Sequence, residues 1–150
     1  VEHPVTELVT GTDLIKTQIH CGLGGELTES YVQKGHALEC RINAEDPMNF
    51  MPSPGKVTSI TVPGGNGVRF DTFIRPGSEV PPYYDSMVGK LLTHSYDRPS
   101  AIAKMQRALG HMEVEGIKTN IDLHKLVLRH PDFLLPSYDT AILSKILPKV

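Results

Sequence analysis

The sequence predicts an α+β fold, because hydrophobic residues follow a helical period at both ends of the chain and alternate in the middle. A helical pattern covers the first 20 residues, strand and turn patterns fill residues 35–93, and helical patterns return after residue 97. The 150 residues suffice for one domain, or for a small domain with part of another. We therefore expect a leading helix, then an antiparallel, barrel-sandwich-like sheet, then C-terminal helices against it.

The first helix is predicted to begin near Pro4 and to run to about His20. Proline suits the first helical turn, where its missing N–H would have no partner. The amphipathic face recurs at spacings of three and four and consists of Val5, Leu8, Val9, Thr12, Ile15 and Ile19. Gly22, Gly24 and Gly25 should end the helix, one of them as a left-handed cap. Residues 26–34 are mostly polar and are expected to form a connector that contains the domain boundary.

The middle of the chain is predicted to form the sheet. Apolar Leu38, Cys40 and Ile42 alternate with polar Glu39, Arg41 and Asn43, which is typical of a strand with one buried face. Residues 56–62 and 68–73 indicate strands on either side of a glycine-rich turn at 63–67, and residues 87–93 indicate another strand.

The last third is predicted to be helical. Asp97 or Ser100 can cap a helix whose apolar stripe is Ile102, Met105, Leu109 and Met112. A short strand at 114–117 follows, then a helix capped by Thr119 or Asn120 and ended by Pro131. A final short helix is expected around residues 142–146.

Composition excludes several function classes. A net charge of −2 gives no electrostatic reason to expect nucleic acid or an anionic membrane, and no apolar run is long enough to span a bilayer. Cys21 and Cys40 form neither a CxxC pair nor a secreted cysteine framework, which favours a reducing, cytoplasmic location. The seven histidines show no zinc spacing, so no metal site is predicted. The chain starts at Val1 and runs straight into a helical pattern, as expected of a fragment.

Two segments have unusual chemistry. A guanidinium rooted in a strand is a rigid, permanently charged donor, so Arg41 can either bind an anion or simply solvate an exposed strand face. Residues 81–87 place two prolines and two tyrosines before Asp85, which indicates either a proline-stiffened turn with half-buried tyrosines or a carboxylate that pairs with Arg41 and orients it. The pattern alone leaves both questions open.

A resemblance to a known family favours a functional role for these segments. Its motifs lie in residues 1–16, 35–47, 52–56 (Pro-Ser-Pro-Gly-Lys), 83–87 (Tyr-Tyr-Asp-Ser-Met) and 116–120 (Gly-Ile-Lys-Thr-Asn). In this order they resemble the biotin carboxylases of biotin-dependent carboxylases over essentially the whole chain. The resemblance implies that residues 1–34 end an ATP-grasp region, leading helix included, and that residues 35–150 form the biotin carboxylase C-terminal domain.

The resemblance also implies a reaction and its residues. ATP phosphorylates bicarbonate, and the carboxyl group then passes to biotin. Glu2 matches the base that deprotonates bicarbonate, and the backbone of Val1 matches a bicarbonate contact. Arg41 matches the group that binds biotin and stabilises the oxyanion of its ureido group, with Asp85 as possible support.

Cofactors and partners follow from the same resemblance. They are ATP with Mg²⁺ or Mn²⁺, a biotin carboxyl carrier protein, a carboxyltransferase component and the upstream ATP-grasp domains. The parent enzyme would be an acetyl-CoA carboxylase of fatty acid biosynthesis, or a pyruvate or other acyl-CoA carboxylase. A homodimer is possible, although Asn66 replaces a bulky aromatic found at the dimer contact of bacterial members. The fragment alone is expected to be inactive. The alternatives are a non-catalytic interaction or dimerisation module and another ATP-grasp ligase.

Overall fold

The centre of the molecule is a three-stranded antiparallel sheet with the order β1-β6-β4. The computed structural model describes residues 2–27 and 30–147. β1 spans His36–Asn43, β6 spans Met87–Ser95 and β4 spans Val68–Thr72. β6 lies in the middle of the sheet, and five of its nine residues are buried, because a central strand has neighbours on both sides. The mixture of helices and antiparallel sheet confirms the expected α+β class.

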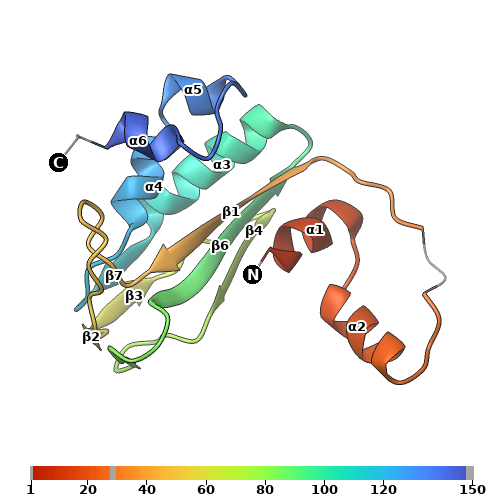
Figure 1. The fold of residues 1–150 in the computed structure, drawn as a ribbon, viewed down its shortest axis with the longest axis horizontal. Coiled ribbons are helices and arrows are strands. Elements are labelled where there is room, and N and C mark those ends of the chain that lie inside the picture. The colour runs from red at the N-terminus through yellow and green to blue at the C-terminus, as the bar shows by residue number, and fades with distance from the viewer. Residues whose placement is uncertain (1, 28–29, 148–150) are drawn as a thin grey trace.

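The two faces of the sheet carry different helices (Figure 1). Helix α3 (Arg98–His111) packs on β6 and β1 and covers the apolar face, while α1 (His3–Thr10) packs on β1 from the other side. The fully buried side chains between α3 and the sheet include Ile42, Leu91, Met105 and Leu109. The alternation predicted for β1 is therefore confirmed, with Cys40 and Ile42 in the core and Arg41 exposed.

Two short strand pairs complete the sheet region. β2 (Gly55–Lys56) pairs with β5 (Glu79–Val80), and β3 (Ser59–Thr61) pairs with β7 (Glu113–Glu115). The single strand predicted for residues 56–62 is wrong, because fully buried Val57 bonds to Ser78 while Thr58 bonds to Glu115, so the chain changes partner at this point. The glycine-rich turn at 63–67 consequently joins β3 to β4 without forming a hairpin.

The predicted leading helix is in fact two helices, α1 and α2 (Leu14–Gly22). Gly11 adopts a left-handed conformation with φ 73° and donates its N–H to the carbonyl of Glu7, which ends α1. Asp13 then starts α2 by accepting a hydrogen bond from the N–H of Lys16 at 2.8 Å. α2 buries none of its residues, and its tip ends at a left-handed Gly24, as expected for one of these glycines.

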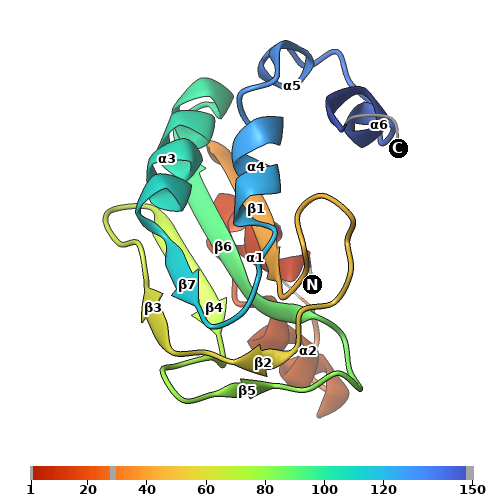
Figure 2. The ribbon, with the colours of Figure 1, turned by 90° about the vertical axis from the view of Figure 1, so that its left-hand side faces the viewer.

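The C-terminal helices pack beside α3. α4 (Ile121–Val127) contacts α3, and Figure 2 shows the two helices next to each other; α6 (Ile142–Ile146) contacts α4. Asp97 caps α3 as predicted, through the N–H of Ser100 at 2.8 Å. Pro131 was expected to end a helix but instead begins the short helix α5 (Pro131–Leu134), where its missing N–H has no cost. Within the described residues, no helix is both long and apolar enough to cross a membrane.

Candidate functional site

Two residues predicted for the site lie in direct contact. The Nη2 atom of Arg41 on β1 is 2.6 Å from the Oε1 atom of Glu2, which immediately precedes α1. Buried Pro4 in the first turn of α1 anchors this end of the helix, and α1 packs on β1. The helix and the strand therefore bring together a carboxylate and a guanidinium that are 39 positions apart in the sequence.

Both side chains of this pair are accessible to a substrate. The Arg41 side chain is 48% exposed and that of Glu2 is 79% exposed. A hydrogen bond with its own backbone and then positive charge, including that of Arg41, lower the pKa of Glu2 below its ordinary value. The group is therefore an ionised carboxylate at neutral pH, the form in which it can accept a proton.

The face of the sheet beneath α1 carries further charges. The strand register places Arg41, Lys90 and Asp71 in one row across β1, β6 and β4. Glu39 lies on the same face, and its Oε2 atom is buried without a hydrogen-bond partner in the described part of the chain. Burial raises the pKa of Glu39, while the charges of Lys90 and Arg41 oppose this shift. The sequence pattern placed Glu39 on this face but did not indicate that it would be enclosed.

The backbone of Arg41 is held from the free edge of β1. Its carbonyl oxygen accepts a hydrogen bond from Nδ2 of Asn120 at 3.0 Å, and Nε2 of His124 lies 2.7 Å from the same oxygen. The N–H of Asn43 donates to Oδ1 of Asn120 at 2.9 Å. Asn120 was predicted as a helix cap, but its side chain does not cap α4 and bonds to β1 instead.

Asp85 makes a backbone contact in the structure. Its Oδ1 atom accepts the N–H of Met87 at 2.7 Å, and the carboxylate paired with Arg41 is that of Glu2. The next residue, Ser86, contacts the segment that follows β1, because its hydroxyl donates a hydrogen bond to the carboxylate of Glu45. Tyr83 and Tyr84 are exposed rather than half-buried. Val1, the expected bicarbonate contact, lies outside the described residues.

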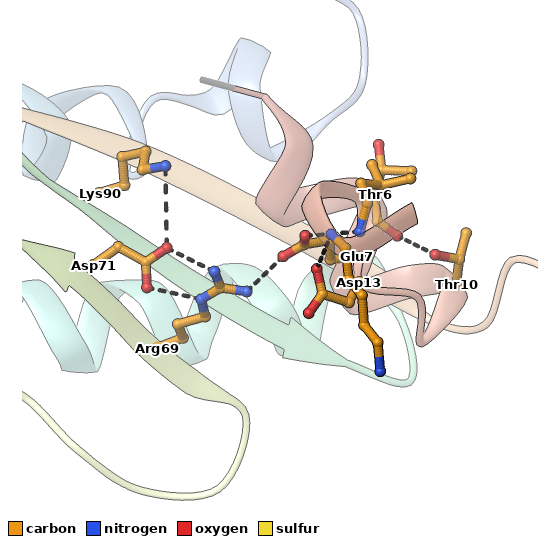
Figure 3. A network of polar contacts seen from close by, with 9 residues as sticks. Thr6, Glu7, Thr10, Asp13, Arg69, Asp71 and Lys90 are labelled. Carbon is orange, nitrogen blue, oxygen red and sulfur yellow. Dashed lines mark hydrogen bonds and ion pairs between the residues drawn. The ribbon is translucent and has the colours of Figure 1, made fainter. Parts of the chain in front are cut away.

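A second polar cluster, which we call the Arg69 network, fixes the helices on the sheet (Figure 3). Arg69 donates from Nε and Nη2 to the carboxylate of Asp71 at 2.8 and 2.7 Å, and from Nη1 to Oε2 of Glu7 at 2.9 Å. The other oxygen of Glu7 accepts the N–H of Leu14 at 3.1 Å, at the start of α2. Hydrogen bonding to Arg69 lowers the pKa of Asp71, and hydrogen bonding to Asp71 raises that of Arg69.

The Arg69 network was not predicted from the sequence. The alternation along β4 places Arg69 and Asp71 on one face, which was an available signal for their pairing. The contact with Glu7 bridges 62 positions and depends on how α1 docks. The network therefore depends on tertiary contacts that local sequence patterns do not reveal. Because Glu7 lies in α1, the network holds α1 on the sheet and so helps to position Glu2.

Metal binding has no candidate among these side chains. Within residues 2–27 and 30–147, no group of three or more His, Cys, Asp or Glu side chains is arranged to hold a metal ion.

Comparisons with known proteins place the chain in a family. Residues 39–145 match the family model described as the biotin carboxylase C-terminal domain. The chain is 54% identical over 136 residues to a biotin carboxylase of Pseudomonas aeruginosa, an alignment that covers 89% of this chain and 30% of that relative. The chain thus spans about a third of the length of the curated relatives it matches.

Solved structures share the fold. The biotin carboxylase of Campylobacter jejuni, in a complex with β,γ-ATP, superposes with a TM-score of 0.92 at 44% identity, over 97% of this chain and 33% of that one. The biotin carboxylase domain dimer of a 2-oxoglutarate carboxylase from Hydrogenobacter thermophilus, solved with MgADP, ADP and bicarbonate, gives 0.93 at 40% identity and the same coverage. Fold, family model and sequence identity agree, and the chain belongs to the biotin carboxylase C-terminal domain family.

Proposed function

We propose that this chain is the carboxyl-terminal part of a biotin carboxylase, which uses ATP and bicarbonate to carboxylate biotin on a carrier protein. The relatives support the substrates, since one was solved with a nucleotide and bicarbonate together. Residues 1–34 would then end the ATP-grasp region, and residues 35–150 would form the C-terminal domain. The exposed α2 is consistent with this division, because its apolar Ile15 and Ile19 would meet the upstream domains.

The contact between Glu2 and Arg41 carries this proposal. The reaction needs a base for bicarbonate and a cation for the ureido oxygen of biotin, and it needs them close enough for the carboxyl group to pass between the substrates. A separation of 2.6 Å between the two side chains meets this requirement before either substrate is bound.

Glu2 would act in the first step. Bicarbonate must lose a proton before its oxygen attacks the γ-phosphate of ATP, and the proton would move to a carboxylate oxygen of Glu2. Glu2 is ionised at neutral pH, and the ionised carboxylate is the form that accepts this proton. The backbone of Val1 would contact the same bicarbonate.

Arg41 would act in the second step. The carboxyl group would pass from carboxyphosphate to N1′ of biotin, and the released phosphate would take up the N1′ proton. As N1′ loses this proton, negative charge develops on the ureido oxygen, and a fixed guanidinium placed there stabilises the transition state. Arg41 would leave Glu2 to take this oxygen. Support of Arg41 by Asp85 stays a prediction, because Asp85 bonds elsewhere in the structure.

The nucleotide and its metal would be held elsewhere in the enzyme. The acidic and histidine side chains of the described residues do not form a site that fits Mg²⁺ or Mn²⁺, so neither step is routed through a metal here. When bound, the metal neutralises phosphate charge.

The remaining partners follow from the proposed reaction. They are the biotin carboxyl carrier protein, a carboxyltransferase component and a second copy of the enzyme, since a relative was solved as a dimer. The acceptor of the parent enzyme would be acetyl-CoA, pyruvate or another acyl compound, and the enzyme would act in the cytoplasm.

A non-catalytic interaction module is the second candidate, and the exposed apolar side chains of α2 favour it. An interaction module would need neither the charge nor the shape of the Arg41 side chain. A conservative change of Arg41 therefore distinguishes the two candidate functions, because it should impair a biotin carboxylase and leave an interaction module unaffected.

Arg41→Lys in the intact enzyme tests the proposal. Lysine keeps the charge but loses the planar two-pronged donor, so we expect carboxylation of biotin to fall by roughly 10- to 100-fold. The melting temperature should not change, because Arg41 is half exposed. Arg75→Lys, on an exposed loop, is the matched control and should have wild-type activity. Wild-type carboxylation by Arg41→Lys would refute the role of Arg41.

A further inference from the structure

We propose that Asn120 is a positioning residue for Arg41, and that it acts by closing the free edge of β1 at the residue that carries the guanidinium. This inference rests on the proposed function of Arg41. It gives the start of α4 a role in the second step, which is to hold the backbone of Arg41 in place.

The edge of β1 is incomplete at this point. β1 is an outer strand, so the carbonyl of Arg41 and the N–H of Asn43 point away from β6, toward a side where the described residues form no further strand. The register with β6 also shifts between Ile42 and Asn43, one residue beyond Arg41. Such irregularities weaken strand pairing and redirect side chains, so the backbone at Arg41 needs support from another element.

Asn120 supplies that support in the manner of a neighbouring strand. The Nδ2 of its side-chain amide donates to the carbonyl of Arg41, and Oδ1 of the same amide accepts the N–H of Asn43. Its own backbone N–H donates to the carbonyl of Asn43 at 3.2 Å. Asn120 is only 6% exposed, so these bonds are shielded from water.

The position of Asn120 in α4 makes this role specific. Asparagine at the residue before a helix normally accepts an N–H of the first turn, which stabilises the helix. Here the side chain makes no such bond, and both ends of its amide are used on β1. The side chain of Asn120 therefore does not stabilise the start of α4. It stabilises instead the backbone of the strand that carries Arg41.

His124 adds a second bond one helical turn later. Its Nε2 lies 2.7 Å from the carbonyl oxygen of Arg41, and because that oxygen can only accept, Nε2 carries the proton. With Ile42 buried in the core and Asn120 and His124 on the edge, the root of the Arg41 side chain is fixed on two sides.

Asn120→Asp in the intact enzyme removes the donor while keeping the shape. Asp can still accept the N–H of Asn43, but it places an oxygen against the carbonyl of Arg41. We expect the kcat for biotin carboxylation to fall about tenfold, within the 10²-fold that a displacement of 1 Å can cost. ATP cleavage that depends on bicarbonate and is measured without biotin should stay within about twofold, since it does not use Arg41. Asn49→Asp is the control, because it is the same change at an exposed residue whose Oδ1 can still accept the N–H of Met51, and it should match the wild type.

A double-mutant cycle separates positioning from general stability. If Asn120 acts through Arg41, Asn120→Asp should lower carboxylation less than about twofold when Arg41 is already Lys. Equal losses in both backgrounds, or wild-type carboxylation by Asn120→Asp alone, would overturn the inference. The single variant Arg41→Lys tests the proposed function independently, so the two failures are distinguishable. Should Asn120→Asp lower the melting temperature too far for assay, the same cycle with His124→Leu decides, because His124 is less buried.

Discussion

The guanidinium of Arg41 and the carboxylate of Glu2 form an ion pair between a strand edge and the start of a helix. Exposed pairs of this kind contribute little to folding stability. Their contact matters instead because it fixes where a base and a cation can meet substrates. The position of Glu2 depends on how α1 docks, and the position of Arg41 depends on how β1 is held at its edge.

Replacement of Glu2 by Gln should impair the first step. An amide cannot accept the bicarbonate proton, so we expect bicarbonate-dependent ATP cleavage in the intact enzyme to fall by about 10²-fold or more. The measurement is phosphate release with and without bicarbonate. Glu79→Gln, an exposed change on β5, should behave like the wild type. Normal turnover in Glu2→Gln would remove Glu2 as the base.

The isolated 150-residue chain should neither hydrolyse ATP nor carboxylate free biotin. The reason is that its described residues offer no metal-binding cluster, and its glycine-rich segment at 22–25 caps a helix instead of holding phosphate. Phosphate release would be measured after a cooperative melt has shown that the chain is folded, with the intact enzyme as positive control. A bicarbonate- and biotin-dependent signal above background would contradict this expectation.

Loss of the Arg69 network should destabilise the fold. Arg69→Met leaves the carboxylate of Glu7, whose side chain is only 11% exposed, without its charged partner, so we expect a loss of about 2 kcal/mol in the free energy of unfolding. Lys125→Met breaks a more exposed ion pair with Asp122 and should change the free energy of unfolding by less than about 0.5 kcal/mol. Urea unfolding compares the two variants, and equal midpoints would argue against the role of the network.

Stability should also decline in acid through Asp71. Hydrogen bonding to Arg69 lowers the pKa of Asp71 in the folded state, so the unfolded chain binds the proton more readily. This contribution is complete above the ordinary Asp pKa of about 4 and is lost as the pH falls through the lower folded value. Asp71→Asn should therefore reduce stability at pH 7 and flatten the decline below about pH 4. Asp122→Asn serves as the exposed control, and an unchanged pH profile in Asp71→Asn would contradict the assignment.

Local patterns predicted the parts of the fold that depend on local interactions. Alternation identified β1 and its buried face, and the Asp97 cap identified the start of α3. The break at Gly11 was missed although Asp13 is a good cap, because apolar spacing continues across it. The division of residues 55–61 between two strand pairs depends on partners far along the chain and had no local signal.

The candidate site shows the same limit. Glu2 and Arg41 were named from family motifs, and the structure adds that they are in contact. The bonds of Asn120 to Arg41 join residues 79 positions apart, and sequence reasoning assigned Asn120 the local role of a helix cap. A short polar side chain at a helix start can bond to its own helix or to a neighbouring strand, and only the packed structure decides between them.

The two cysteines differ in exposure, and this difference can be used to measure how often β1 opens. Cys21 at the end of α2 is exposed, whereas Cys40 is buried beside Arg41, where burial raises the pKa of its thiol to about 12. Alkylating reagents react with the thiolate, so they should modify Cys21 in the folded protein and reach Cys40 only when β1 leaves the sheet. The rate of that second modification would report how often the strand that carries Arg41 opens.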